Sequence, residues 1–456
     1  MAQLDEHLLP LTADAANRYL KDIRSRRVSA DPAAVQSLRQ HLQGDIPDKG
    51  QSPVKTLEFL EQYGSPATVA SAGGRYFGFV TGGSVPAALA ANWLAGAWDQ
   101  NGFSSVSSPA LAAFEDAALR WLKNILGLPG EAGGALVTGA TMANFTCLAA
   151  ARHKALQNVG WDVENDGLAG SPGITIVVGE EVHATVYKVL AMLGLGRNNV
   201  IRLPVNEQGA IVPGNLPDLE GPAIVCLQAG NVNSGAFDPA AELISWAKSH
   251  GAWIHVDGAF GLWAAASPRL SHLATPFSDA DSWATDAHKW LNVPYDNGVA
   301  VVQDADALHQ AMAINAAYLP PGATRDAIEY TPDSSRRARG VDIWAALNSL
   351  GRKGVSDMIE QNCDQALQMS KALEQAGVRI LNEVVLNQVV AAFDNLETTE
   401  EVIRRVQEDG TCWCGGTTWR GQAAMRISFS SHATTQNDVE QSIDAVLTAY
   451  SSAKST

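Results

Sequence analysis

Cysteines are few in this chain, and long hydrophobic runs are missing. Only 5 of the 456 residues are cysteines, scattered along the sequence. An odd number of scattered cysteines is typical of free thiols in a reducing compartment and argues against a disulfide framework. No run reaches the roughly 18 apolar residues that a membrane-spanning helix needs, and the first residues lack a signal-peptide pattern. We therefore expect a cytoplasmic protein.

Basic residues are fewer than acidic residues in this chain. The 32 lysines and arginines face 48 aspartates and glutamates, which gives a formal net charge of -16. A surface of this sign repels nucleic acids and anionic membranes, so we expect neither as a partner and predict a small-molecule substrate instead. Cys412 and Cys414 stand close together, but no second Cys or His pair follows at ligand spacing, so we expect no metal site.

An alternation of helical and strand patterns is present. Between residues 105 and 310, amphipathic helical segments alternate with short apolar runs such as ITIVVG, AIVCL and WIHVD. This alternation predicts an α/β fold whose central sheet is mostly parallel and covered by helices on both faces. Ligands of such sheets bind at the carboxyl ends of the strands.

The patterns divide the chain into four parts. Residues 1–105 predict a helical arm too thin to form its own core, and residues 106–315 form the large ligand-binding domain. A loop and a connecting helix follow at 316–355, and residues 356–456 predict a smaller C-terminal α/β domain. The arm needs another surface to cover its apolar positions.

Two charged side chains follow buried strand patterns. Asp257 closes the run WIHVD, and the small residues Gly258 and Ala259 after it would let a flat ligand approach closely. Lys289 lies in the segment TDAHKW at 285–290, which is otherwise poor in charge. Taken singly, Asp257 is more often a loop cap and Lys289 a solvated amine. Together with the glycine turn described next, they favour a ligand site.

The segment GGALVTGATMAN at 133–144 is a short strand, a glycine turn and the start of a helix. Free N–H groups and the helix dipole at such a point favour a phosphate, and Thr141 adds a hydroxyl donor. The segment matches neither a Walker loop nor the dinucleotide GxGxxG pattern, and alone such a turn is more often a structural cap. His183 opens another helix, where its imidazole could stack on a flat ring or merely cap the helix.

Four motifs occur in a fixed order: GATMAN at 139–144, VHAT at 182–185, HVDGAF at 255–260 and DAHKW at 286–290. This order resembles the group II pyridoxal-phosphate-dependent amino acid decarboxylases, which include the aromatic amino acid and glutamate decarboxylases. That family belongs to the aspartate aminotransferase superfamily of fold type I. The resemblance covers nearly the whole chain.

The resemblance implies pyridoxal 5'-phosphate as the cofactor, held as an internal aldimine (a Schiff base) on Lys289. Asp257 would pair with the pyridine nitrogen, which keeps the ring protonated and able to accept the electron pair released at Cα. His183 would stack on the ring. The predicted cofactor-binding residues are Ala140, Thr141, His183, Asp257, Ala259, Asp286, His288 and Lys289.

The resemblance also implies a substrate pocket and a mobile loop. Residues 320–335 correspond to a loop that covers the site in the family, and Tyr330 would be the catalytic proton donor to Cα beside Lys289, Asp257 and His183. This loop is shorter than in the aromatic amino acid enzymes, and the chain reads GNVNS at 230–234 where those enzymes have a Gly-Thr-Thr-Thr run. The predicted substrate-pocket residues are Phe79, Thr81, Phe103 and Arg426.

Three functions follow from these patterns. The first is decarboxylation of an L-amino acid. The second is another pyridoxal-phosphate reaction, such as transamination, aldol-type cleavage or β-elimination, because Arg426 lies where transaminases of this fold keep a carboxylate-binding arginine. Arg426 could equally pair with nearby acids. The third, a non-catalytic homologue, is disfavoured by the joint presence of Lys289, Asp257 and His183.

We also expect a homodimer. The family packs its helical arm across the partner chain, and the active site would then be shared between chains, with Phe103 coming from the neighbour. The sequence names neither the amino acid substrate nor the pathway.

Overall fold

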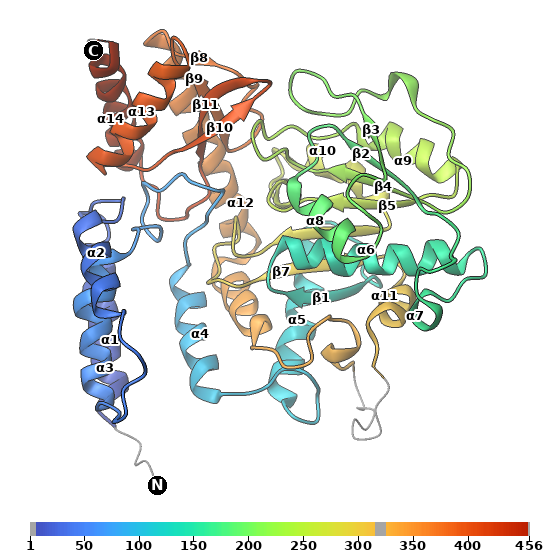
Figure 1. Cartoon of the computed structure of the whole chain (residues 1–456), viewed down its shortest axis with the longest axis horizontal. Helices are drawn as coiled ribbons and strands as arrows, with labels where there is room; N and C mark the ends of the chain where they lie inside the picture. The colour runs from blue at the N-terminus through green and yellow to red at the C-terminus, as the bar shows by residue number, and fades with distance from the viewer. Residues whose placement is uncertain (1–5, 315–324, 455–456) are drawn as a thin grey trace.

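The computed structural model describes residues 6–314 and 325–454, so part of the predicted loop lies outside the described residues. A seven-stranded sheet forms the centre, in the order β1-β7-β6-β5-β4-β2-β3 (Figure 1). Strands β3, β2, β4, β5 and β6 are parallel neighbours, while β7 runs antiparallel to both β6 and β1. The predicted mostly parallel α/β sheet is therefore confirmed. The strands are β1 Gly133–Val137, β2 Thr175–Gly179, β3 Val200–Leu203, β4 Ala223–Gln228, β5 Trp253–Asp257, β6 Ser282–Asp286 and β7 Gly298–Val302.

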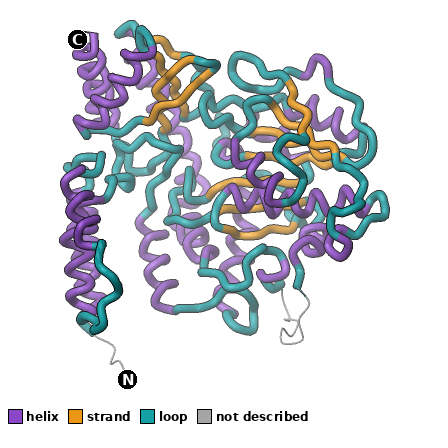
Figure 2. The backbone as a smooth tube through the Cα atoms, in the orientation of Figure 1, coloured by secondary structure: helices purple, strands orange, loops and turns teal. Residues whose placement is uncertain are grey.

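Helices cover both faces of this sheet (Figure 2). Because side chains alternate along a strand, Ile254 and Val256 of β5 enter one core cluster while Trp253 enters the other. The first cluster is closed by α5, α9 and α12, and the second by α6, α8 and α11. These helices are α5 Pro109–Ile125, α6 Ala140–Gln157, α8 Ala184–Met192, α9 Ala240–Ser249, α11 Ala305–Met312 and α12 Arg339–Gln375, with the short helices α7 Val163–Asp166 and α10 Ser271–Ala274 between them.

A second, smaller sheet with its own core forms the C-terminal domain. Its four strands are antiparallel in the order β10-β11-β9-β8. Helix α12 reaches it from the large domain and is broken at Gly351, whose φ is +61°. The exact domain boundaries stay predictions. The elements are β8 Arg379–Ile380, β9 Gln388–Ala392, α13 Leu396–Asp409, β10 Gly415–Trp419, β11 Gln422–Ser428 and α14 Gln436–Lys454.

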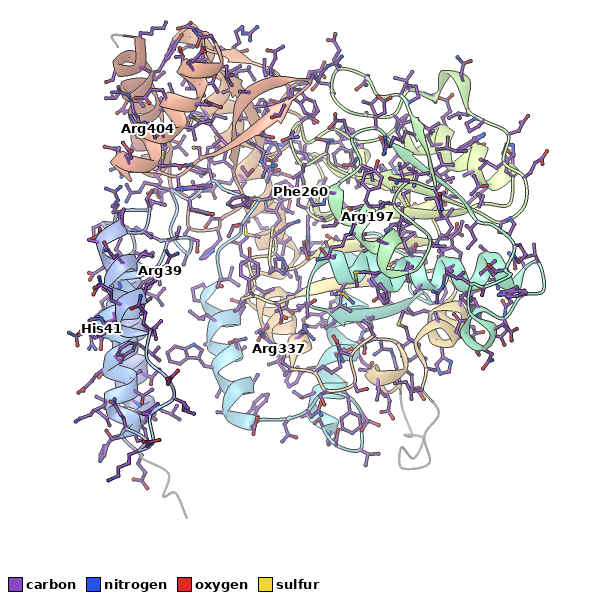
Figure 3. All side chains as sticks on the ribbon, in the orientation of Figure 1. Arg39, His41, Arg197, Phe260, Arg337 and Arg404 are labelled. Carbon is purple, nitrogen blue, oxygen red and sulfur yellow. The ribbon has the colours of Figure 1, made fainter. Side chains whose placement is uncertain are left out.

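The N-terminal arm stands beside these two domains. Helices α1 Leu8–Asp22, α2 Pro32–His41 and α3 Pro53–Phe59 contain no buried residue. Arg39 and His41 lie on this column of helices, away from the large sheet (Figure 3). The next helix, α4 Pro86–Trp98, leaves Trp93, Leu94 and Trp98 exposed. A single chain therefore leaves apolar side chains of the arm and of α4 uncovered.

Among the described helices, none has the length and apolar character needed to cross a membrane.

Candidate active site

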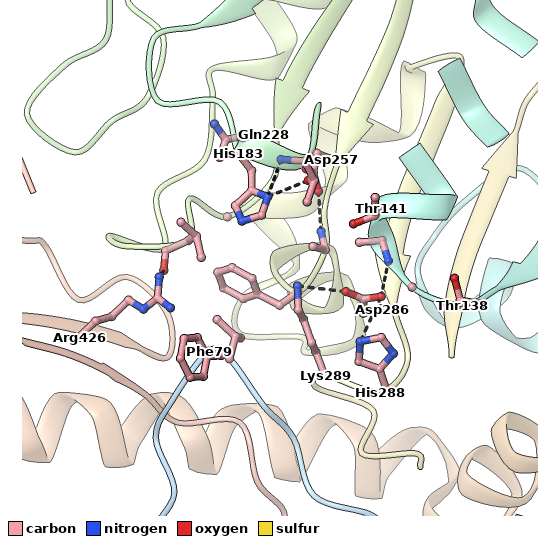
Figure 4. Close-up of a pocket in the computed structure, with 18 residues that line it drawn as sticks. Phe79, Thr138, Thr141, His183, Gln228, Asp257, Asp286, His288, Lys289 and Arg426 are labelled. Atoms are coloured by element: carbon pink, nitrogen blue, oxygen red, sulfur yellow. Dashed lines mark hydrogen bonds and ion pairs between the residues drawn. The ribbon is translucent and has the colours of Figure 1, made fainter. Parts of the chain in front are cut away.

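A cavity of about 480 Å³ lies at the carboxyl ends of β4, β5 and β6 (Figure 4). The N-termini of α6 and α8 border it, and Phe79 and Arg426 reach it from a loop and from β11. This is the sheet edge where parallel strands present their ligand-binding side chains. The predicted residues that line it are Phe79, Ala140, Thr141, His183, Asp257, Ala259, Asp286, His288, Lys289 and Arg426.

Lys289 follows β6 and points into the cavity. Its Nζ lies 3.0 Å from Oδ2 of Asp286, whose side chain is only 3% exposed. The other oxygen, Oδ1, accepts from the backbone N–H of Ala140 at 2.6 Å. The loop before α4 presses on this turn, because a Cβ at Gly82 would lie 1.9 Å from the Lys289 carbonyl oxygen. Glycine at position 82 therefore lets the loop pass directly over the lysine.

His288 is held in one tautomer. The backbone N–H of Asn297 donates to its Nδ1 at 3.1 Å, so the proton is on Nε2, which faces Asp286 Oδ1 at 3.5 Å. Burial lowers the pKa of His288, although Asp286 opposes that shift. His288 is therefore a neutral imidazole whose one N–H points at the anionic Asp286.

Asp257 and His183 stand across the cavity from Lys289. Asp257 ends β5, and its Oδ1 accepts from the backbone N–H of Ala259 at 3.2 Å. His183 is the N-cap of α8, where its Nδ1 accepts from the Thr185 backbone N–H. Burial lowers the pKa of His183, with Asp257 acting in the opposite direction. The capping alternative is thus seen in the structure, and it orients the ring beside the cavity.

The glycine turn before α6 supplies backbone donors. Gly139 has no side chain to cap the helix, and residues 138–141 line the cavity. The turn lies against β7, because a Cβ at Gly298 would lie 2.4 Å from the Gly139 Cα. The N-terminus of a helix, a lysine, a carboxylate and two neutral imidazoles fit a flat ring that carries a phosphate. The cavity therefore fits pyridoxal phosphate.

Three predicted residues do not line this cavity in the described part of the single chain: Thr81, Phe103 and Tyr330. Tyr330 packs against the Arg325 guanidinium at 4.4 Å and the His309 ring at 5.5 Å. The carbonyl of Phe103 accepts from the backbone N–H of Ile328 at 3.0 Å. A proton-donor role for Tyr330 stays a prediction.

Arg426 enters the cavity without an acidic partner. Its Nη1 donates to the Val232 carbonyl at 3.2 Å and lies 3.5 Å from Asn233 Oδ1. Within residues 6–314 and 325–454 it forms no ion pair with a carboxylate, so the predicted alternative of pairing with nearby acids is not seen. A half-buried guanidinium of this kind is suited to an anionic group of a ligand.

Sequence reasoning missed Gln228 and Asn292. Gln228 ends β4 directly beside Asp257 in the sheet register, a position that the strand pattern could have revealed. Asn292 carries no sequence signal, yet it has φ +57° and joins three segments. It accepts from the N–H groups of Gly83 and His432 at 2.8 and 2.9 Å, and donates to the carbonyl of Ser430 at 2.8 Å.

Comparison with known proteins gives the family. Residues 37–393 match the pyridoxal-dependent decarboxylase conserved domain. The aromatic-L-amino-acid decarboxylase of Bacillus atrophaeus is 24% identical over 97% of this chain and 93% of its own length. The 4-hydroxyphenylacetaldehyde synthase of Rhodiola rosea is 26% identical over 94% of this chain and 91% of its own.

The fold agrees with solved structures. The crystal structure of Oryza sativa TDC with PLP and tryptamine superposes with a TM-score of 0.90 at 22% identity, covering 99% of both chains. The matched domain spans well over half of the sequence and confirms the predicted family, enzyme class and cofactor. The chain belongs to the pyridoxal-dependent decarboxylases, lyases that use pyridoxal 5'-phosphate.

Proposed function

We propose that this enzyme decarboxylates an L-amino acid, with its cofactor bound covalently to Lys289. The observation that carries the proposal is the single cavity in which Lys289, Asp257 and the N-terminus of α6 face the same space. When bound, pyridoxal phosphate supplies an electron sink for the pair left at Cα when CO2 departs. A site of this composition supports that chemistry.

Each residue then has a defined task. Lys289 would attack the cofactor's aldehyde as a neutral amine, and Asp286 Oδ2, which lies 3.0 Å from its Nζ, orients it in the cavity. Asp257 would pair with the pyridine nitrogen of the bound cofactor and keep it protonated. The neutral ring of His183 would stack on the cofactor ring. The phosphate would be bound by first-turn N–H groups of α6 other than that of Ala140, by the Thr141 hydroxyl and by the His288 imidazole.

Arg426 supports a second candidate, transamination. Its guanidinium faces the cavity without a carboxylate partner among the described residues, as the anchor of a substrate carboxylate would. Decarboxylation is the better-supported proposal because the family is one of decarboxylases. The relative from Rhodiola rosea is named for an aldehyde product, so the product must be measured directly.

We expect cofactor-loaded protein to release CO2 from at least one amino acid of a panel that spans aromatic, acidic and basic side chains. The amine should appear in a one-to-one ratio to CO2, because protonation at Cα completes a decarboxylation. Trapped CO2, amine, aldehyde and keto acid are quantified in the same reaction. A keto acid formed without CO2 would contradict decarboxylation and favour transamination.

We also propose a homodimer whose active sites are shared between chains. The arm has no buried residue in α1, and Leu9 and Leu11 are 67% and 42% exposed. Covering such side chains stabilises an interface by about 25 cal/mol per Å² of buried apolar surface. Sedimentation equilibrium should show a dimer at assay concentration, and Leu9→Arg with Leu11→Arg should weaken it at least about tenfold.

Leu367→Arg is the matched control for the dimer prediction, because Leu367 is an exposed leucine on α12 and not on the arm. It should leave the dimer intact. A fully active monomer of the unmodified protein would contradict the shared site.

A further inference from the structure

We propose that Asn144 and His255 are positioning residues that hold the Asp257 carboxylate in place through a buried chain of hydrogen bonds. This inference rests on the proposed function, in which Asp257 pairs with the cofactor's ring nitrogen. Neither Asn144 nor His255 lines the cavity, so both would act through Asp257.

The chain of hydrogen bonds follows one face of β5. Trp253, His255 and Asp257 alternate with Ile254 and Val256 and therefore point to the same side, where α6 packs. Asn144 of α6 donates from Nδ2 to Asp257 Oδ2 at 3.2 Å. Its Oδ1 lies 2.9 Å from His255 Nε2.

Two further groups continue the chain behind His255. Ser282 Oγ lies 2.9 Å from His255 Nδ1, and Trp253 Nε1 donates to the same oxygen at 2.9 Å. Asn144, His255 and Ser282 are fully buried. No solvent reaches these groups, so each must be satisfied by its neighbour in the protein.

The chemistry of the end groups fixes every proton in between. A carboxylate only accepts, so Asn144 turns its N–H to Asp257 and its oxygen to His255, whose Nε2 must donate. At the other end, the Trp253 indole only donates, so the Ser282 oxygen accepts from it and gives its own proton to His255 Nδ1. Burial lowers the pKa of His255 to about 3, which keeps the ring neutral with a bare Nδ1.

The consequence is a carboxylate held from two sides. Oδ1 of Asp257 is held by the Ala259 N–H and Oδ2 by Asn144, which leaves the remaining lone pairs to face the cavity. Asn144 can donate to Asp257 in this orientation only while His255 donates to its Oδ1. Because misplacing a reacting group by about 1 Å can cost about 100-fold in rate, a loss of this support should be measurable.

The test compares His255→Leu with His255→Gln. Leucine fills the space but donates no hydrogen bond, whereas the glutamine amide can still donate to Asn144 Oδ1. We expect His255→Leu to lower kcat about 10- to 100-fold with little change in KM, and His255→Gln to stay within about threefold of the unmodified enzyme. Equal losses in both variants would show that His255 only fills volume and would overturn the proposal.

A spectroscopic reading separates this proposal from the proposed function. With cofactor labelled with 15N at its ring nitrogen, NMR should show a protonated nitrogen in the unmodified enzyme, and His255→Leu should shift it toward the unprotonated form. If the protonation of the ring nitrogen changes in Asp257→Asn but not in His255→Leu, the positioning role is overturned. If the protonation of the ring nitrogen is unchanged in Asp257→Asn, the proposed role of Asp257 is wrong, and the inference fails with it.

The tautomer provides a reading that needs no cofactor. The 15N signals of His255 should show a protonated Nε2 and a bare Nδ1, and the opposite tautomer would contradict the inferred direction. If His255→Leu does not fold, Ser282→Ala replaces it, because removing the hydroxyl leaves His255 Nδ1 without its donor. Ser282→Thr keeps the hydroxyl and is the control. Equal rates in these two variants would also overturn the proposal.

Discussion

Replacing Lys289 with alanine should reduce turnover by roughly four orders of magnitude or more, the size of effect seen when a covalent catalytic residue is removed. Among the described residues that line the cavity, only Lys289 has an amine that can form a reducible covalent link to the cofactor's aldehyde. In the unmodified protein, borohydride should therefore fix the cofactor to a single peptide that contains Lys289. The rate is measured as CO2 release, and the label is located by peptide mapping.

Lys188→Ala is the matched control, because Lys188 is an exposed lysine on α8 that does not line the cavity. Its rate and label should equal those of the unmodified enzyme. A label that persists in Lys289→Ala would end the assignment of Lys289.

Asp257→Asn should retain the cofactor and slow turnover by about three orders of magnitude. The substitution preserves the volume of the side chain and removes its charge, so the effect reports the loss of the protonated ring that accepts electrons. The amide also brings N–H groups to a place where Asn144 and Ala259 already donate. Cofactor content by absorbance and kcat by product formation are measured on the same sample.

Near-normal kcat in Asp257→Asn with full cofactor content would exclude the ring-nitrogen role. Loss of the cofactor itself would point to a binding role instead. Asp279→Asn, at an exposed aspartate outside the cavity, is the control for handling and assay.

Local sequence signals were enough to predict the centre of the site. Asp257 ends an apolar strand, and Lys289 follows the next one, so their meeting at one sheet edge follows from parallel topology alone. The turn before α6 was predictable because glycine and a helix pattern follow each other directly in sequence. Each of these signals spans only a few residues.

Other parts of the site depend on contacts that a single sequence does not reveal. The hydrogen bond between Asn144 and Asp257 joins residues 113 positions apart, and no spacing rule relates them. Tyr330 and Phe103 were predicted from the resemblance, yet in the described part of one chain neither lines the cavity. The predicted role of Phe103 requires a second chain, and that of Tyr330 requires the loop at 320–335 to cover the site, neither of which the sequence of one chain describes.

Asn292 has a consequence for anyone who dissects this enzyme into fragments. Its side-chain amide donates to the carbonyls of Lys289 and Trp290 in the lysine turn, but another of its acceptors, the Ser430 carbonyl, lies 138 positions further along the chain. The His432 N–H that it accepts comes from the same distant segment. A truncated large domain would expose this amide without its Ser430 and His432 partners. The smallest fragment that keeps the lysine turn intact must therefore extend past residue 432, and co-expressed halves are a better route than truncation.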